Sequence, residues 1–200
     1  RTDTGVHASG QVIAFDFEWK HSSQNLLAAL NANLPLDVVA SSAMIVHDSF
    51  HPRFDAISRT YRYRIICQPV RDPLRERYAW RVFPELDLLA LRQSAERLVG
   101  IHDFAAFGAP PRTGGVTIRQ VFHCDWLQCA DEYIFEVKAN AFLYHMVRRM
   151  VGFQVGIGQG KYRLQELDSR LSAKPQELIK DLAPPQGLTL EKVEYLENVV

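Results

Sequence analysis

The sequence predicts an α+β protein whose strands pair mainly in an antiparallel manner. Apolar residues recur along the chain both at the two-residue period of a strand and at the helical period. Predicted helices are interspersed among strands, yet several strands follow one another directly, which favours antiparallel pairing over a doubly wound parallel sheet. With 47% hydrophobic residues in 200, the chain has the composition of a globular protein rather than a disordered one.

The first part of the chain predicts one helix between two strands. Residues 10–17 combine a glycine with β-branched and aromatic residues, which is typical of a strand. Ser22 or Ser23 is a suitable N-cap for the leucine-rich helix that follows, and Pro35 ends it. Residues 37–46 are a second strand candidate.

Residues 59–67 show the clearest strand pattern in the chain. Tyr61 and Tyr63 alternate with Arg62 and Arg64. Because successive side chains of a strand point to opposite faces, the aromatic rings and the guanidinium groups should lie on opposite sides of the sheet.

The rest of the chain predicts four helices and three strands. Asp87 is placed to cap a helix that ends before Gly100. The other predicted elements are strands at 116–127 and 133–139, a helix at 142–157, short helices at 164–171 and 176–182, and a strand at 188–196.

Charge points to a local rather than a global basic surface. The formal net charge is zero, so no overall field attracts a polyanion. The stretch between residues 51 and 81, called here the arginine stretch, holds eight arginines and three acids. Arginine forms forked contacts with phosphate, so this stretch indicates a polyanionic partner; on charge alone, a solvated basic surface explains it equally well. The arginines are Arg53, Arg59, Arg62, Arg64, Arg71, Arg75, Arg77 and Arg81.

Other sequence features restrict the class of protein. No apolar run approaches the roughly 20 residues of a membrane-spanning helix, and residues 1–10 lack the apolar core of a signal peptide. We therefore expect a cytoplasmic protein without a membrane partner. The three cysteines contain no C-x-x-C pair, so reduced thiols are expected rather than a zinc site.

Three positions carry candidate chemistry. Asp3 is a loop carboxylate flanked by small residues; the alternative is a turn aspartate bonded to its own backbone. Tyr61 could stack on a base, although aromatic residues also fill the core beside ordinary strands. Arg148 lies among apolar neighbours on its predicted helix, so its guanidinium either reaches water or needs an anionic partner.

Several ordered blocks of the sequence together resemble the TruA-type tRNA pseudouridine synthases. The first block, RTDTGVHASGQV, matches a signature of that family, and the likeness continues in order over nearly the whole chain. The other blocks are NANLP at 31–35, FHPRFDAISRTYRYRI at 50–65, GIHDFAAF at 100–107, TIRQV at 117–121, ANAFLYHMVRRMVG at 139–152 and APPQGLTLEKVEY at 183–195.

The resemblance implies a role for each matched residue. Asp3 corresponds to the catalytic aspartate, Tyr61 to the residue that packs on the target base, and Arg148 to the cation that pairs with the carboxylate. Arg1 corresponds to an arginine that helps to hold the flipped nucleotide. The predicted substrate contacts are Arg1, Tyr61, His7, Arg59 and Arg62.

It also implies the fold and the reaction. We expect two ferredoxin-like α+β halves with a central cleft, residues 1–49 belonging to the first and 50–200 forming the second. The expected activity is isomerisation of uridine to pseudouridine at positions 38, 39 and 40 of the tRNA anticodon arm by a homodimer, with no cofactor and no metal. The carboxylate acts either as a nucleophile or as a base that removes the 2′ proton. Because the chain opens inside the motif, we expect that an N-terminal segment of the family is missing.

Two alternatives come from other functional classes. One is a tRNA-binding module or fragment without catalytic activity. The other is a metal-dependent hydrolase that uses His7, His51, His102, Asp103 and His145. No two of these residues have the i, i+4 spacing with a helical acid that such enzymes use.

Overall fold

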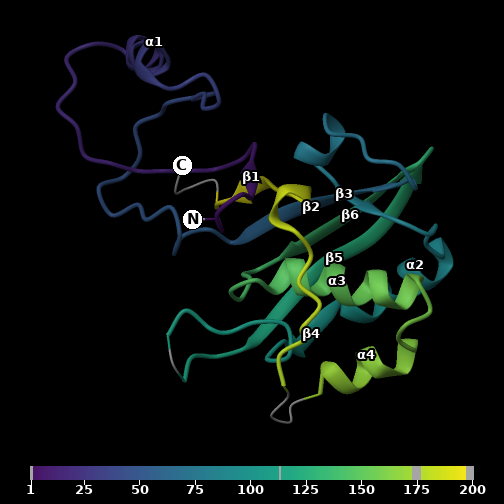
Figure 1. Ribbon diagram of the computed structural model, residues 1–200. Helices are drawn as coiled ribbons and strands as arrows, with labels where there is room; N and C mark the ends of the chain where they lie inside the picture. Colours follow the sequence, from purple (N-terminus) through teal and green to yellow (C-terminus); the bar gives the residue numbers. More distant parts are fainter. Residues whose placement is uncertain (1, 113, 173–176, 197–200) are drawn as a thin grey trace. The chain divides into compact units, whose positions relative to one another are not determined.

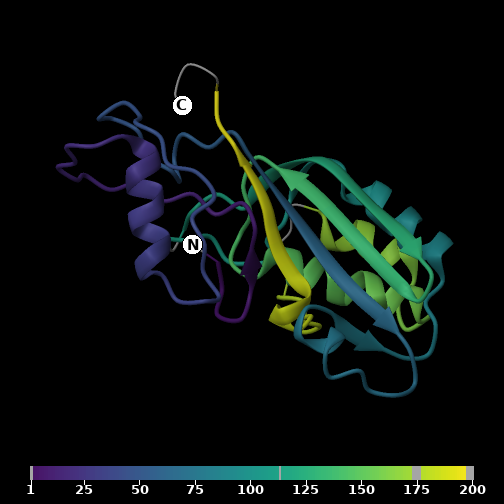
Figure 2. The same ribbon diagram turned by 90° about the horizontal axis from the view of Figure 1, so that it is seen from above.

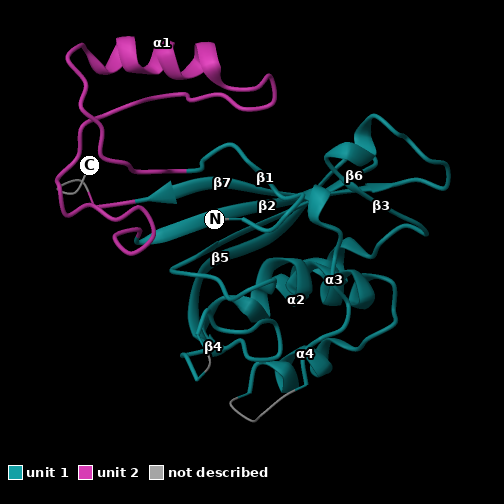
Figure 3. Cartoon of the chain, turned by 60° about the vertical axis from the view of Figure 1, so that its left-hand side comes forward, with its two compact units in different colours: residues 1–11, 57–194 teal, residues 12–56, 195–200 magenta. Residues whose placement is uncertain are grey.

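The computed structural model describes residues 2–112, 114–172 and 177–196. By its contacts the chain divides into two compact units (Figure 3). The larger unit comprises Arg1–Gln11 and Ile57–Glu194, and the smaller comprises Val12–Ala56 and Tyr195–Val200.

One mixed sheet forms the framework of the larger unit (Figure 1). Its strands lie in the order β1-β7-β2-β6-β5-β4, with β3 paired to β2 off this path. The pairs β1–β7 and β2–β3 are parallel and the other four are antiparallel, so the predicted α+β class with a largely antiparallel sheet is confirmed. The strands are β1 (His7–Ala8), β2 (Ser58–Cys67), β3 (Trp80–Val82), β4 (Gly100–Asp103), β5 (Ile118–Cys129), β6 (Glu132–Ala139) and β7 (Leu188–Glu194).

Helices α2 (Leu88–Leu98) and α3 (Met146–Gly158) cover one face of this sheet (Figure 2). Asp87 caps α2 as predicted, its side chain accepting from the amide of Ala90. Burial of apolar side chains between the sheet and these helices makes the main stabilising contribution, roughly 25 cal/mol for each Å² of apolar surface removed from water. The core includes Tyr63, Trp126, Phe135 and Val137 from the sheet and Leu91, Leu98, Met150 and Val151 from the helices.

Shorter elements complete the larger unit. Helix α4 (Leu164–Arg170) follows α3, and two 3-10 helices, η1 (Arg75–Arg77) and η2 (Pro185–Gly187), precede β3 and β7. No helix of the described chain combines the length and apolar character needed to cross a membrane.

The smaller unit contains helix α1 (Ser23–Asn33) and irregular segments. Ser22 is its N-cap, the side chain accepting from the amide of Asn25 at 3.3 Å. The predicted strands at 10–17 and 37–46 are wrong, because the structure shows irregular backbone there. Their residues have the composition of a strand, and the amide of Gly10 donates to the carbonyl of Leu190 in β7 at 3.0 Å, but this contact does not continue as a ladder along the described residues 11–17. Phe15 and Ile45 are accordingly exposed.

Other boundaries also differ from prediction. The predicted helix at 176–182 begins at a residue outside the described chain, and its described part is not helical. Helix α3 begins at Met146 rather than at residue 142, because Tyr144 pairs with Ala109 in an isolated bridge and His145 has a left-handed backbone. Strands β3 and β4 were not predicted; each has only three or four residues, too few to show a period.

Candidate active site

The loop that carries Asp3 is held against the end of the sheet. The amide of Val6 donates to the carbonyl of Asp3 at 3.1 Å, which closes a tight turn. Gly5 within it has φ +81°, a conformation that L residues rarely adopt. A Cβ at Gly5 would also lie 3.1 Å from the ring of Pro185 in η2. The loop backbone therefore fixes the carboxylate of Asp3 beside η2.

Arg148 reaches the same place from the first turn of α3. Its side chain is only 10% exposed. Nε donates to the carbonyl of Ala183 at 2.7 Å, and Nη1 lies 3.4 Å from Oδ2 of Asp3. A buried guanidinium without partners would cost several kcal/mol, and these two contacts compensate it. The pairing of Asp3 with Arg148 implied by the resemblance is therefore present.

Gly152 lets the segment that accepts the hydrogen bond of Arg148 pack closely against α3. A Cβ at Gly152 would lie 2.2 Å from the carbonyl oxygen of Asp181, so only glycine permits this packing. The amide of Ala183 also donates to the carbonyl of Arg148 at 3.2 Å. The segment from Asp181 to Ala183 is thus fixed on the first half of the helix, which sets the direction of the guanidinium.

His145 is a third member of this group. Its Nε2 lies 3.3 Å from Oδ2 of Asp3, the same oxygen that Arg148 contacts. Burial lowers the pKa of the imidazole, Asp3 raises it, and Arg148 and Arg149 lower it further. The sequence analysis did not assign His145 to this site. The available signal was its place three residues before Arg148 in the predicted helix at 142–157, although in the structure His145 precedes the helix.

Tyr61 lies on β2 near this group. Its ring packs edge-on against Phe142, with centroids 5.1 Å apart. Burial first, and the charge of Asp3 second, raise the pKa of its phenol to about 12, while Arg59 opposes them. The phenol is therefore protonated at neutral pH. Its electrostatic coupling to Asp3 and Arg59 places all three side chains in one neighbourhood.

Tyr63, two residues further along β2 on the same face as Tyr61, has a structural role. It is fully buried, and its hydroxyl donates to the carbonyl of Pro184 at 2.7 Å. Burial raises the pKa of this phenol far above its usual range. A Cβ at Gly187 would meet the Tyr63 ring at 2.6 Å, so the glycine makes room for the ring. Tyr63 thus helps to fix the segment that holds Arg148.

The other predicted substrate contacts lie in different surroundings. Arg59 donates from Nη1 to the carbonyl of Asn140 at 2.7 Å. Arg62 points to the sheet face opposite Tyr61, where Glu136 and Glu191 each lie 3.4 Å from it. His7 contacts the carbonyl of Arg77 at 3.1 Å and the ring of Tyr78. Arg1 lies outside the described residues.

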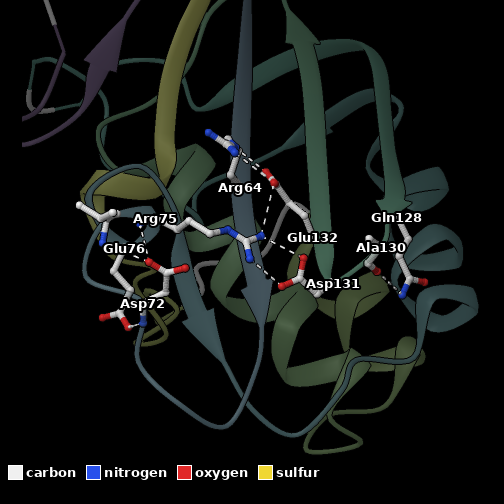
Figure 4. Close-up of polar contacts among 9 residues, drawn as sticks. Arg64, Asp72, Arg75, Glu76, Gln128, Ala130, Asp131 and Glu132 are labelled. Atoms are coloured by element: carbon white, nitrogen blue, oxygen red, sulfur yellow. Dashed lines mark hydrogen bonds and ion pairs between the residues drawn. The ribbon is translucent and has the colours of Figure 1, made fainter.

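Most of the arginine stretch is charge-compensated. At least five of its eight arginines form ion pairs, and Figure 4 shows Arg64 and Arg75 directed at Asp131 and Glu132. Most of the partners come from β6, its preceding turn and β7, so a count of acids within the stretch missed them. The pairs are Arg62 with Glu136 and Glu191, Arg64 with Glu132, Arg75 with Asp131 and Glu132, and Arg71 and Arg81 with Glu76.

A search for metal ligands gives no candidate centre. Among the described residues, no three or more His, Cys, Asp or Glu side chains gather in a way that could hold a metal ion. The five residues considered for a metal-dependent hydrolase therefore do not form such a group in the described chain. The groups around Asp3 are instead a guanidinium, an imidazole and the aromatic ring of Tyr61, an arrangement suited to orienting a carboxylate beside a planar ligand.

Comparison with known proteins supports one family. A family model described as tRNA pseudouridine synthase matches residues 94–196. The tRNA pseudouridine synthase A of an Exiguobacterium species is 40% identical over 195 residues, covering 98% of this chain and 78% of the relative. That of Bacillus subtilis is 37% identical, covering 98% and 79%, and that of Histophilus somni (strain 129Pt) is 38% identical, covering 98% and 72%.

Proposed function

Because this chain belongs to the tRNA pseudouridine synthase A family, which isomerises uridine in tRNA, we propose that Asp3 is the carboxylate that carries its chemistry. One observation supports this assignment above the others. Asp3 is the acid on which Arg148 and His145 converge, in the first of the matched blocks. Both neighbours approach the same oxygen, Oδ2, so they orient the carboxylate for the reaction.

The reaction exchanges one bond to the ribose for another. The bond from N1 of uracil to C1′ breaks, a bond from C5 to C1′ forms, N1 gains a proton and C5 loses one. In one route the ionised Asp3 attacks as a nucleophile. In the other it removes the 2′ proton, giving a glycal. Either route uses the same carboxylate in the same charge state and needs no redox partner.

Tyr61 is proposed to stack on the target base. A uridine in the anticodon arm must leave its stack to reach Asp3, at a cost of a few kcal/mol. Stacking on an aromatic side chain returns about 1–3 kcal/mol of this. With a pKa of about 12, the phenol of Tyr61 is a poor acceptor for the C5 proton at neutral pH. We therefore assign the ring to stacking rather than to proton removal.

The finer aspects of the substrate and assembly are also proposals. We propose that the enzyme acts on positions 38, 39 and 40 of the anticodon arm, works in the cytoplasm as a homodimer, and contacts RNA through Arg1, His7, Arg59 and Arg62. The resemblance supports each point. Arg59 has structural support as well, because its charge acts on Tyr61. An RNA phosphate beside a stacked base would lie near both side chains.

Release of tritium from tRNA labelled at C5 of uridine tests this function, because the C5 proton is lost in the reaction. We expect release from natural tRNA, and loss of nearly all release when the uridines at 38 to 40 are replaced by cytidine. Unchanged release from the replaced tRNA would contradict the assigned positions. Binding of tRNA without any release would support the inactive binding module instead.

A further inference from the structure

The backbone of His145 is in an unusual conformation. It has φ 63° and ψ 8°, in the left-handed region, directly before the first residue of α3. In the described chain one other residue with a side chain, Ala130, has a positive φ, and it lies in the tight turn between β5 and β6. Histidine tolerates this region better than most residues, but it remains a sparsely populated conformation. Such conformations persist where the surroundings hold them, often at functional sites.

The consequence of this conformation is the position of the imidazole. The ring stacks on Tyr144, with centroids 3.7 Å apart, and its Nε2 lies 3.3 Å from Oδ2 of Asp3. Its side chain is 18% exposed. The charged groups that face it are Asp3 from the N-terminal loop and Arg148 and Arg149 from α3.

The imidazole is neutral at the pH at which the enzyme is expected to work. Burial is the main reason that its pKa falls below the usual value of 6.5, and the two arginines add to the effect against the charge of Asp3. A neutral imidazole has one N–H group. Since Nε2 lies 3.3 Å from a carboxylate oxygen, the tautomer with the proton on Nε2 directs its N–H group toward that oxygen.

We propose that His145 is a positioning residue which, together with Arg148, holds Oδ2 of Asp3 and leaves Oδ1 to meet the nucleotide. The inference rests on the proposed function, in which Asp3 is the reacting carboxylate. His145 Nε2 and Arg148 Nη1 approach the same oxygen, at 3.3 and 3.4 Å. A hydrogen bond from Arg148 and the close contact of the imidazole converge on one oxygen and restrict rotation of the carboxylate. The other oxygen keeps more of its electron density for attack or for proton removal.

The test compares His145→Gln with His145→Met in the full chain. Glutamine and methionine have similar lengths and the same backbone cost at a positive φ, but only glutamine offers an N–H group. We expect His145→Gln to keep kcat within about threefold and His145→Met to lose about tenfold or more, because methionine removes the N–H group that approaches the charged oxygen. KM for tRNA should stay within about twofold in both, because the donor acts on Asp3 and not on substrate.

Rescue by glutamine is the readout that a purely structural role would not give. His145→Gln and His145→Met carry the same backbone cost, so the N–H group is what separates their kcat values. Equal losses in the two variants, or losses confined to KM, would overturn the inference. Asp3→Asn in the same assay separates the two proposals: an active Asp3→Asn overturns the proposed function itself.

A measurement on the unaltered protein covers the case in which the methionine variant does not fold. Nitrogen NMR of the wild-type chain should show the His145 tautomer protonated at Nε2, with a signal that shifts in Asp3→Asn. The opposite tautomer, with Nε2 unprotonated toward Asp3, would overturn the inference.

Discussion

At the scale of single residues, Asp3 owes its placement to partners distant in sequence. Its own loop contributes one turn, while Arg148 and His145 come from the start of α3. The buried guanidinium is in turn held by the carbonyl of Ala183. Removing one member of such a group leaves the others without their partners, which costs more than the contact itself contributes.

Arg148→Met should therefore damage both stability and activity. The variant removes the guanidinium from Asp3 and leaves the carbonyl of Ala183 without its donor, so we expect a loss of about 2–3 kcal/mol in the free energy of unfolding. Urea unfolding measures this, and tritium release measures the activity. Arg97→Met is the control, since Arg97 pairs with Asp168 on the surface and should contribute at most about 1 kcal/mol. Unchanged unfolding and rate in Arg148→Met would contradict this account.

The candidate residues show how far the sequence leads at this scale. The family motifs indicated Asp3, Tyr61 and Arg148, and the structure places Arg148 against Asp3. His145 lies in one of the matched blocks but was considered only as a metal ligand, because no helical period reports a left-handed residue just before a helix. Only coordinates show which atom of Asp3 it faces.

At the scale of elements, the end of β7 is tied to two other strands through one carboxylate. Glu194 accepts from Ser58 of β2 and pairs with Lys138 of β6, and Lys192 lies 3.0 Å away. These partners lower the pKa of Glu194 from 4.5 to about 2. β2 and β7 also pair directly, so this contact adds to the backbone ladder rather than replacing it.

The lowered pKa of Glu194 predicts a pH-dependent contribution to stability. A group whose folded pKa is depressed stabilises the protein above its unfolded pKa, so the contribution should be full above about pH 4.5 and lost as the pH falls toward 2. After allowance for solvent screening, Glu194→Gln should cost up to about 1 kcal/mol at pH 7. The loss of stability caused by Glu194→Gln should be smaller when unfolding is measured at low pH. An equal cost at both pH values would contradict the linkage.

Prediction of the elements succeeded where many consecutive residues followed a hydrophobic period, and it failed where pairing between strands decided the structure. Strand β2 and helix α2 were predicted within one residue, because ten or more residues showed their period. Residues 10–17 and 37–46 have the composition of strands, but beyond the contact of Gly10 with β7 they form no strand ladder in the described chain. A strand needs a partner for its backbone groups, and composition does not supply one.

At the scale of the whole molecule, charge is balanced across strands rather than along the chain. The net charge is zero, and the arginine stretch meets carboxylates on neighbouring strands. Electrostatic attraction for RNA therefore depends on which arginines lie near the site rather than on how many the sequence contains. Arg59 acts on Tyr61, whereas Arg64 forms two hydrogen bonds with Glu132.

These two arginines provide a matched pair for testing RNA binding. Arg59→Ala should weaken tRNA binding and reduce the slope of log K against log salt by about one, as loss of a phosphate contact does. Arg64→Ala should leave both nearly unchanged, because the charge of Arg64 is already paired with Glu132 of the neighbouring strand β6. Filter binding at several salt concentrations measures both. Equal effects of the two substitutions would contradict this account, because they would show that tRNA binding does not depend on how near an arginine lies to Tyr61.

The most direct test of the central claim is single-turnover tritium release by Asp3→Asn, with tRNA affinity measured alongside. Asparagine keeps the shape of the side chain but can neither attack nor remove a proton. We predict a rate below about a hundredth of wild type, tRNA affinity within about tenfold, and a wild-type rate for the control Asp37→Asn, which alters an exposed aspartate. A residual rate above that hundredth would contradict the claim that the chemistry runs through Asp3.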